Sequence, residues 1–92
     1  MKGKMEKEKI IKTLKDTLNR IKEEKNKIQS NSSGWESIIS IYEKAIIDAE
    51  NNMFFSISDA TRIYLEFNSN YTSDIFKIME FTEKEVENYF EN

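Results

Sequence analysis

Residues 5–29 read MEKEKIIKTLKDTLNRIKEEKNKIQ, and this stretch decides the fold class. Its apolar side chains recur every three or four residues and are interrupted once, by a lysine; the series is Ile11, Leu14, Leu18, Ile21, Lys25 and Ile28, with Ile10 beside it. That spacing places them on one side of an α-helix, while lysine and glutamate fill the other sides. We therefore predict one long amphipathic helix with a buried stripe.

Three further stretches show the same periodicity, and polar segments separate them. A loop at 30–34 precedes a helix that ends near residue 50, where two asparagines stop it. The next helices are expected over 57–67 and 72–90. A capping pattern at Thr82 favours a fifth helix, but the apolar stripe from Ile75 to Phe90 continues across it and favours a single one.

The turn residues of the chain support a helical fold. Proline is absent and only two glycines occur, whereas an all-β domain of 92 residues needs many tight turns. We predict an all-α domain over residues 1–92, built as a bundle of four main helices with antiparallel neighbours and about 70–80 helical residues. Residues 1–4 are expected to fray, and Met53-Phe54-Phe55 to plug one end of the bundle.

The residue types that are missing exclude several kinds of chemistry. The chain has no cysteine and no histidine, so it cannot form a disulfide, a Cys or His zinc site, or a Ser-His-Asp triad. Glu80 and Glu83 match the first half of the carboxylate pattern of magnesium-dependent nucleotide pyrophosphatases, but the second half does not follow. We expect no cofactor, no metal and no enzymatic activity; a magnesium-dependent enzyme, built on a weak carboxylate site, ranks third after the two binding functions given below.

Nothing in the apolar pattern suggests a membrane segment. The longest apolar run is three residues, whereas a signal peptide needs about 7–15 and a membrane span about 20. A cytoplasmic location is the expectation.

Charge is divided unevenly along the chain. Residues 1–30 carry a net charge of +5, and residues 31–92 carry −8. The basic part interleaves lysine with acidic residues and contains a single arginine, and the rest of the domain would repel a polyanion, so we expect no nucleic-acid partner. Either the two parts attract each other within the bundle, or one of them meets an oppositely charged protein.

The acidic C-terminal stretch supplies the residues predicted to contact a partner. Carboxylates outnumber lysines there, and aromatic residues lie to either side of the apolar stripe, where they are either buried or serve as contacts with acidic neighbours. The candidates are Asp74, Glu80, Glu83, Glu85, Glu87, Glu91, Tyr71, Phe76 and Phe81.

Residues 35–80 resemble small helical immunity proteins, which bacteria use in contact-dependent growth inhibition to neutralise a nuclease toxin. The resemblance lies in Ile38–Asn51, in Ser58-Asp59-Ala60-Thr61-Arg62-Ile63 and in Ser73-Asp74-Ile75-Phe76. It includes no motif from which a functional residue can be transferred. It implies a protein that binds a basic toxin domain and covers its active site.

Two functions follow as expectations. The first is inhibition of a basic protein partner, which requires no catalytic residue. The alternative is a helical adaptor that self-associates through residues 5–29, whose stripe is long enough for a coiled-coil seam. Lys25 interrupts that stripe and would meet its own copy across a dimer, so a monomer is expected in the absence of the partner.

Overall fold

The computed structural model describes residues 4–27, 32–67 and 73–91, and nearly all of these are helical. The helices are α1 (Lys4–Lys27), α2 (Ser32–Glu50), α3 (Ser58–Phe67) and α4 (Asp74–Glu91). The all-α prediction is confirmed. α4 passes through Thr82 without a break, so the apolar stripe was the better guide there than the capping pattern.

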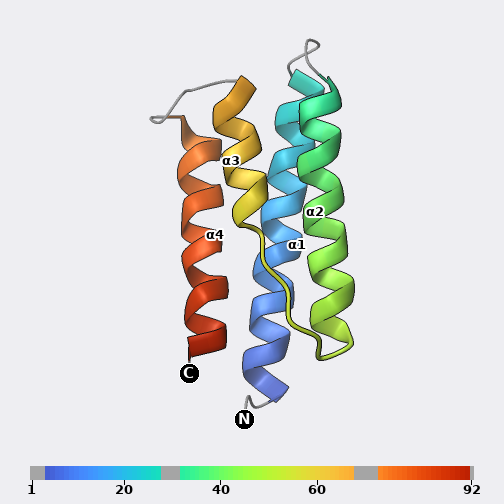
Figure 1. Cartoon of the computed structure of the whole chain (residues 1–92), viewed down its shortest axis with the longest axis vertical. Coiled ribbons are helices and arrows are strands. Elements are labelled where there is room, and N and C mark those ends of the chain that lie inside the picture. The colour runs from blue at the N-terminus through green and yellow to red at the C-terminus, as the bar shows by residue number, and fades with distance from the viewer. Residues whose placement is uncertain (1–3, 28–31, 68–72, 92) are drawn as a thin grey trace.

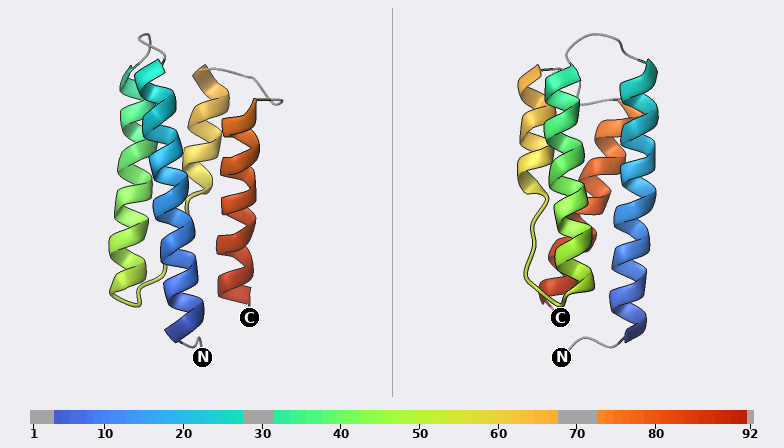
Figure 2. Two further views of the ribbon diagram at one scale, coloured as in Figure 1. Left: turned by 180° about the vertical axis from the view of Figure 1, so that it is seen from behind. Right: turned by 90° about the vertical axis from the view of Figure 1, so that its right-hand side faces the viewer.

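The four helices form an up-down-up-down bundle (Figure 1). Each helix contacts the next along the chain, and α4 returns to contact α1, so every contacting pair is antiparallel, as predicted. Figure 2 shows the same order from behind and from the side. The body measures 42 × 21 × 17 Å, and α1 begins at the end where α2 and α4 stop.

A single apolar core runs along the bundle axis. Its widest part contains three aromatic rings: Trp35 packs edge-on against Tyr64 with ring centres 5.7 Å apart, and Tyr64 stacks on Phe76 at 5.9 Å. The stripe of α1 is centred on Ile10 and Leu14, which are buried, whereas Ile11 is only partly buried. The predicted stripe was therefore shifted by about one position at its start.

The end of α2 sets the path of the following segment. Asn52 adopts a left-handed backbone conformation with φ of 60°, which asparagine tolerates better than most residues. The Met53 amide donates to the Asp48 carbonyl at 2.8 Å, and the Asn52 amide donates to the Ala49 carbonyl at 3.2 Å. These bonds form a Schellman motif, which satisfies the last carbonyls of α2 and turns the chain back along the bundle.

Residues 53–57 then run beside the bundle as an extended chain before α3 begins (Figure 1). Only Phe55 of the three apolar residues enters the core, with 4% of its surface exposed, whereas Met53 is 58% and Phe54 73% exposed. The prediction that all three plug the end of the bundle is wrong for Met53 and Phe54. In an extended chain successive side chains point in opposite directions, so Phe54 faces out when Phe55 faces in.

Two polar contacts fix α4 against its neighbours. The Ser73 hydroxyl caps α4 by accepting the Phe76 amide at 3.2 Å, and it also bonds the Tyr64 hydroxyl of α3 at 2.7 Å. Deeper in the bundle, the Thr17 and Thr82 hydroxyls lie 2.6 Å apart, and both residues are buried. Thr82 donates its only proton to the Ile78 carbonyl at 2.9 Å, so Thr17 is the donor to Thr82.

We expect the buried hydroxyl pair to behave as one unit when it is mutated. Thr17→Val and Thr82→Val should each lower the free energy of unfolding by about 1–2 kcal/mol, because each leaves a buried hydroxyl group short of a partner. The double variant should lose less than the sum, with a coupling of about 1 kcal/mol. Urea unfolding of the four proteins measures this cycle, and strict additivity would contradict the pairing.

Candidate partner-binding surface

α4 carries most of the exposed acidic charge of the C-terminal half. It contains six carboxylates and two lysines and packs between α1 and α3. Throughout the described ranges, ion pairs join residues of α1, α2 and α3 only, and none includes a residue of α4. The basic α1 lies beside α4, yet no ion pair between described residues links them. Within the described ranges the six carboxylates of α4 therefore have no cationic partner, and Asp74, Glu80, Glu87 and Glu91 are exposed to water.

The predicted contact residues do not form one surface. Glu87 and Glu91 border a hollow beside the extended segment 53–57, whereas Glu85 borders the groove between α1 and α4. Phe81 is 60% exposed and lies in the same α1–α4 groove, next to Arg20. The structure therefore divides the acidic side chains of α4 between two sides of the helix.

Among the predicted aromatic contacts, Phe76 lies in the core and not on the surface. The prediction that Phe76 contacts a partner is wrong, because only 5% of its surface is exposed and its ring stacks on Tyr64 inside the core. It cannot serve as a surface anchor in this fold. Tyr71 lies outside the described residues.

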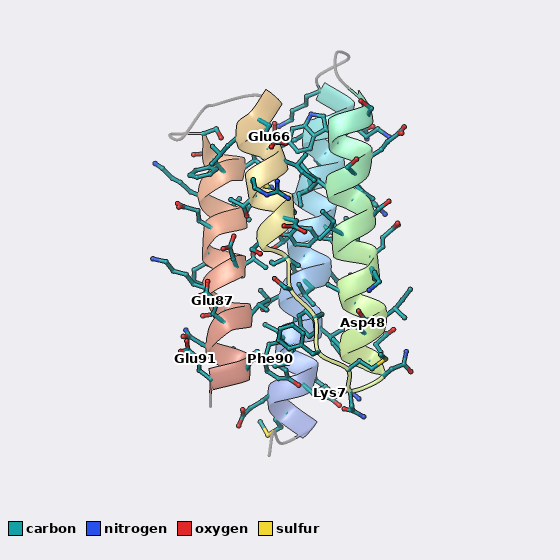
Figure 3. The ribbon with its side chains drawn as sticks, viewed as in Figure 1. Lys7, Asp48, Glu66, Glu87, Phe90 and Glu91 are labelled. Atoms are coloured by element: carbon teal, nitrogen blue, oxygen red, sulfur yellow. The ribbon has the colours of Figure 1, made fainter. Side chains whose placement is uncertain are left out.

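The structure reveals exposed aromatic residues that the sequence prediction missed. The Phe54 and Phe90 rings lie 4.8 Å apart, and Phe90 also packs edge-on against the buried Phe55 at 5.0 Å. Phe54 and Phe90 are 73% and 37% exposed. Figure 3 shows Phe90, Glu87 and Glu91 together on the last turns of α4. We use the name aromatic–acidic end for five residues: Met53, Phe54, Glu87, Phe90 and Glu91.

The short length of α3 explains why this end of α4 is exposed. Phe76, Glu83 and Phe90 are seven residues apart, so they project from the same side of the helix. α3 covers Phe76 at one end of that side. α3 is too short to reach the other end, where Phe90 meets the extended segment instead.

The helix ends add to the negative potential of this region. α2 and α4 both stop at this end of the bundle, and neither has a basic residue in its last turn. The C-terminus of a helix carries partial negative charge, so Glu91 and Glu87 sit where acidic side chains are least favourable. Glu87 and Glu91 are therefore expected to lower the stability of α4 slightly.

Glu83 has a different environment from the other carboxylates. It is partly buried, and its negative charge acts on the Tyr42 hydroxyl in the core. Burial, and to a smaller extent Glu83, raise the pKa of Tyr42 above its ordinary value near 10. The Tyr42 hydroxyl has no hydrogen-bond partner among the described residues. Glu83 thus lies closer to the core than Glu87 and Glu91 do.

Two further properties of the described residues bear on function. No three of their acidic side chains come together as a group that could hold a metal ion. No helix within the described ranges is both long and apolar enough to cross a membrane.

We expect Tyr42→Phe to stabilise the fold. At about pH 7 it should raise the free energy of unfolding by about 1 kcal/mol, because it removes a buried hydroxyl that lacks a partner. Above about pH 10 the unfolded chain releases the Tyr42 proton and the folded chain retains it, so the parent protein should lose stability as the pH rises. The variant should lack that part of the loss. Urea unfolding at both pH values measures the difference, and equal pH slopes would contradict it.

We expect the acidic residues at the end of α4 to lower stability. Replacing Glu87 and Glu91 together by glutamine should raise the melting temperature by about 1–3 °C, because it removes negative charge from the negative end of the helix. Asp74→Asn provides a control of opposite sign, because Asp74 lies in the first turn of α4. Thermal unfolding followed by circular dichroism measures both. A lower melting temperature for the double variant would show that these glutamates have a structural role.

No protein-family model, no curated protein and no solved structure matches this chain.

Proposed function

We propose that this protein binds a basic protein partner through the acidic surface of α4 and inhibits it by covering its active site. The partner class is a nuclease toxin, which makes this chain an immunity protein. The observation that carries the proposal is the absence of any ion pair to the carboxylates of α4 within the described ranges, although the basic α1 packs beside them.

The chemistry of such a partner explains why free carboxylates would be useful. A nuclease has a basic active site, because its substrate is a polyanion. Carboxylates that are not neutralised inside their own protein can steer that site into contact and then pair with its lysines and arginines. An inhibitor of this kind needs no catalytic group. The resemblance of residues 35–80 to small helical immunity proteins points in the same direction.

The packing of α1 weakens the adaptor alternative. Leu14 and Ile21 in its stripe are fully buried within the bundle, so the stripe is not exposed as a coiled-coil seam. Lys25 pairs with Glu36 of α2 at 3.8 Å. Self-association through α1 would require the bundle to open, and we expect a monomer in sedimentation at micromolar concentration.

The decisive experiment reverses charge on α4. Glu87→Lys with Glu91→Lys should weaken binding to the candidate toxin domain by about 10–100-fold, and the loss should be larger at low salt, where charges are less screened. The measurement is a calorimetric titration of the toxin domain, paired with a growth-protection assay.

A matched control distinguishes the effect of where the charges lie from the effect of the protein's net charge on binding. Glu8→Lys with Glu43→Lys changes the net charge by the same amount on exposed positions of α1 and α2. This control should bind nearly as well as the parent protein. If both double variants lose binding equally, only net charge matters, and if neither does, α4 is not the contact surface.

A further inference from the structure

α3 is little more than half as long as α4, so it covers only part of the side of α4 that it packs against. α3 has 10 residues and α4 has 18, which correspond to lengths of about 15 Å and 27 Å. About 12 Å of α4 therefore has no helix on the side that α3 covers elsewhere. The extended segment 53–57 fills part of this space, but an extended chain is narrower than a helix.

Three surface hollows result, and all of them border Phe54 and Phe55. One lies against α2 and measures about 320 Å³, one lies against Phe90 and Met53 and measures about 530 Å³, and one lies against α4 and measures about 210 Å³. Phe54 stands between them as an exposed ring. Each hollow exceeds the volume of a large side chain, so an incoming segment could place apolar side chains on either side of Phe54.

We propose that the aromatic–acidic end is the docking site for one segment of the basic partner, a segment that carries large apolar side chains flanked by lysine or arginine. The proposal deepens the proposed function and rests on it. The apolar side chains enter the hollows beside Phe54 and Phe90, and the cationic groups pair with Glu87 and Glu91. The aromatic contacts supply most of the affinity, and the carboxylates supply orientation and association rate.

Charge complementarity selects this occupant over others. Glu87 and Glu91 border the hollow nearest α4 and have no ion pair among the described residues. Asp48 and Asp59 border the hollow nearest α2, where Lys44 already pairs with Asp48 at 3.4 Å and Arg62 with Asp59 at 3.1 Å. A second copy docked by two-fold symmetry would place Glu87 and Glu91 against themselves, which like charge opposes. An anionic lipid surface would be repelled for the same reason.

The other exposed phenylalanine of α4 gives an internal comparison. Phe81 borders the groove between α1 and α4, whose walls include Arg20 and Lys77 together with Asp16. Beside Phe81 the groove has a cation on each of its helices, whereas Glu85 lies further along it, so a cationic segment gains little at Phe81. The two sides of α4 therefore differ in charge although each presents one exposed phenylalanine ring.

The experiment titrates the isotopically labelled full chain with an amphipathic leucine–lysine peptide and follows the backbone amide signals by NMR. We expect shifts concentrated in residues 53–57 and 86–91. A lysine-only peptide of equal charge should bind at least about tenfold more weakly, because it lacks the apolar contacts. A leucine–glutamate peptide of the same pattern should not bind.

Two matched pairs of variants locate the site. Phe54→Ala should weaken binding of the leucine–lysine peptide about 10–30-fold, whereas Phe81→Ala should leave it within about twofold. Both rings are mostly exposed, so neither variant should unfold the protein. Glu87→Gln should weaken binding and reduce its salt dependence, whereas Glu85→Gln, on the other side of α4, should not.

The outcomes separate this inference from the proposed function. If toxin binding depends on Glu87 and Glu91 but not on Phe54, the proposed function stands and the docking site is wrong. Amide signal shifts that are centred on Phe81 and Glu85 when the peptide is added would also show that the docking site is wrong. If no cationic probe binds and the α4 reversals leave the toxin titration unchanged, both proposals fail. A dimer that Phe54→Ala disperses would identify a second copy as the occupant instead.

Discussion

The turn after α2 is the constraint on which the exposed surface depends. The Schellman motif at Asn52 sends the chain back along the bundle, but five residues pass before α3 can start, so α3 begins partway up. An extended stretch of five residues spans about 16 Å, close to the length of α4 that α3 leaves uncovered. One face of α4 is therefore closed by a helix where Phe76 lies and by a single extended chain where Phe90 lies.

The polar contacts inside the bundle determine which side of α4 reaches that gap. The Thr17–Thr82 hydrogen bond fixes the rotation of α4 against α1, and the Tyr64–Ser73 contact fixes its start against α3. A rotation of α4 by one residue would bury Glu87 or move Phe90 away from Phe54. Buried hydroxyl pairs oppose such slippage because a misplaced hydroxyl loses its partner in a low-dielectric interior.

Among the described residues, ion pairs separate α1, α2 and α3, whose charges are partly paired, from α4, whose charges are not. α1 and α2 are joined by Lys15–Glu50 and Lys25–Glu36, at 3.8 Å each, and pairs within helices neutralise further charge. α4 has none among the described residues and places Glu91 at its own negative end. Exposed ion pairs contribute little to stability, so the lack of such pairs on α4 among the described residues costs the fold little.

The sequence by itself determined the class of fold and the location of most of the core. Apolar spacing of three and four residues identified all four helices, the continuity of α4 through Thr82, and buried positions such as Leu14, Tyr42 and Met79, because that periodicity is a local property of the chain. The acidic character of α4 was likewise evident from counting.

Only the tertiary structure decided which aromatic residues are exposed. Phe76 and Phe90 lie on the same side of α4, yet the apolar pattern placed Phe90 in the buried stripe and Phe76 among the partner contacts, the reverse of their exposure in the structure. Phe54 and Phe55 likewise look equivalent within their apolar run. Whether each is buried depends on what packs against it, namely α3 for Phe76 and an extended segment for Phe90. The length of α3 and the direction in which α2 releases the chain are set by contacts between segments far apart in the sequence, and helical periodicity carries no information about them.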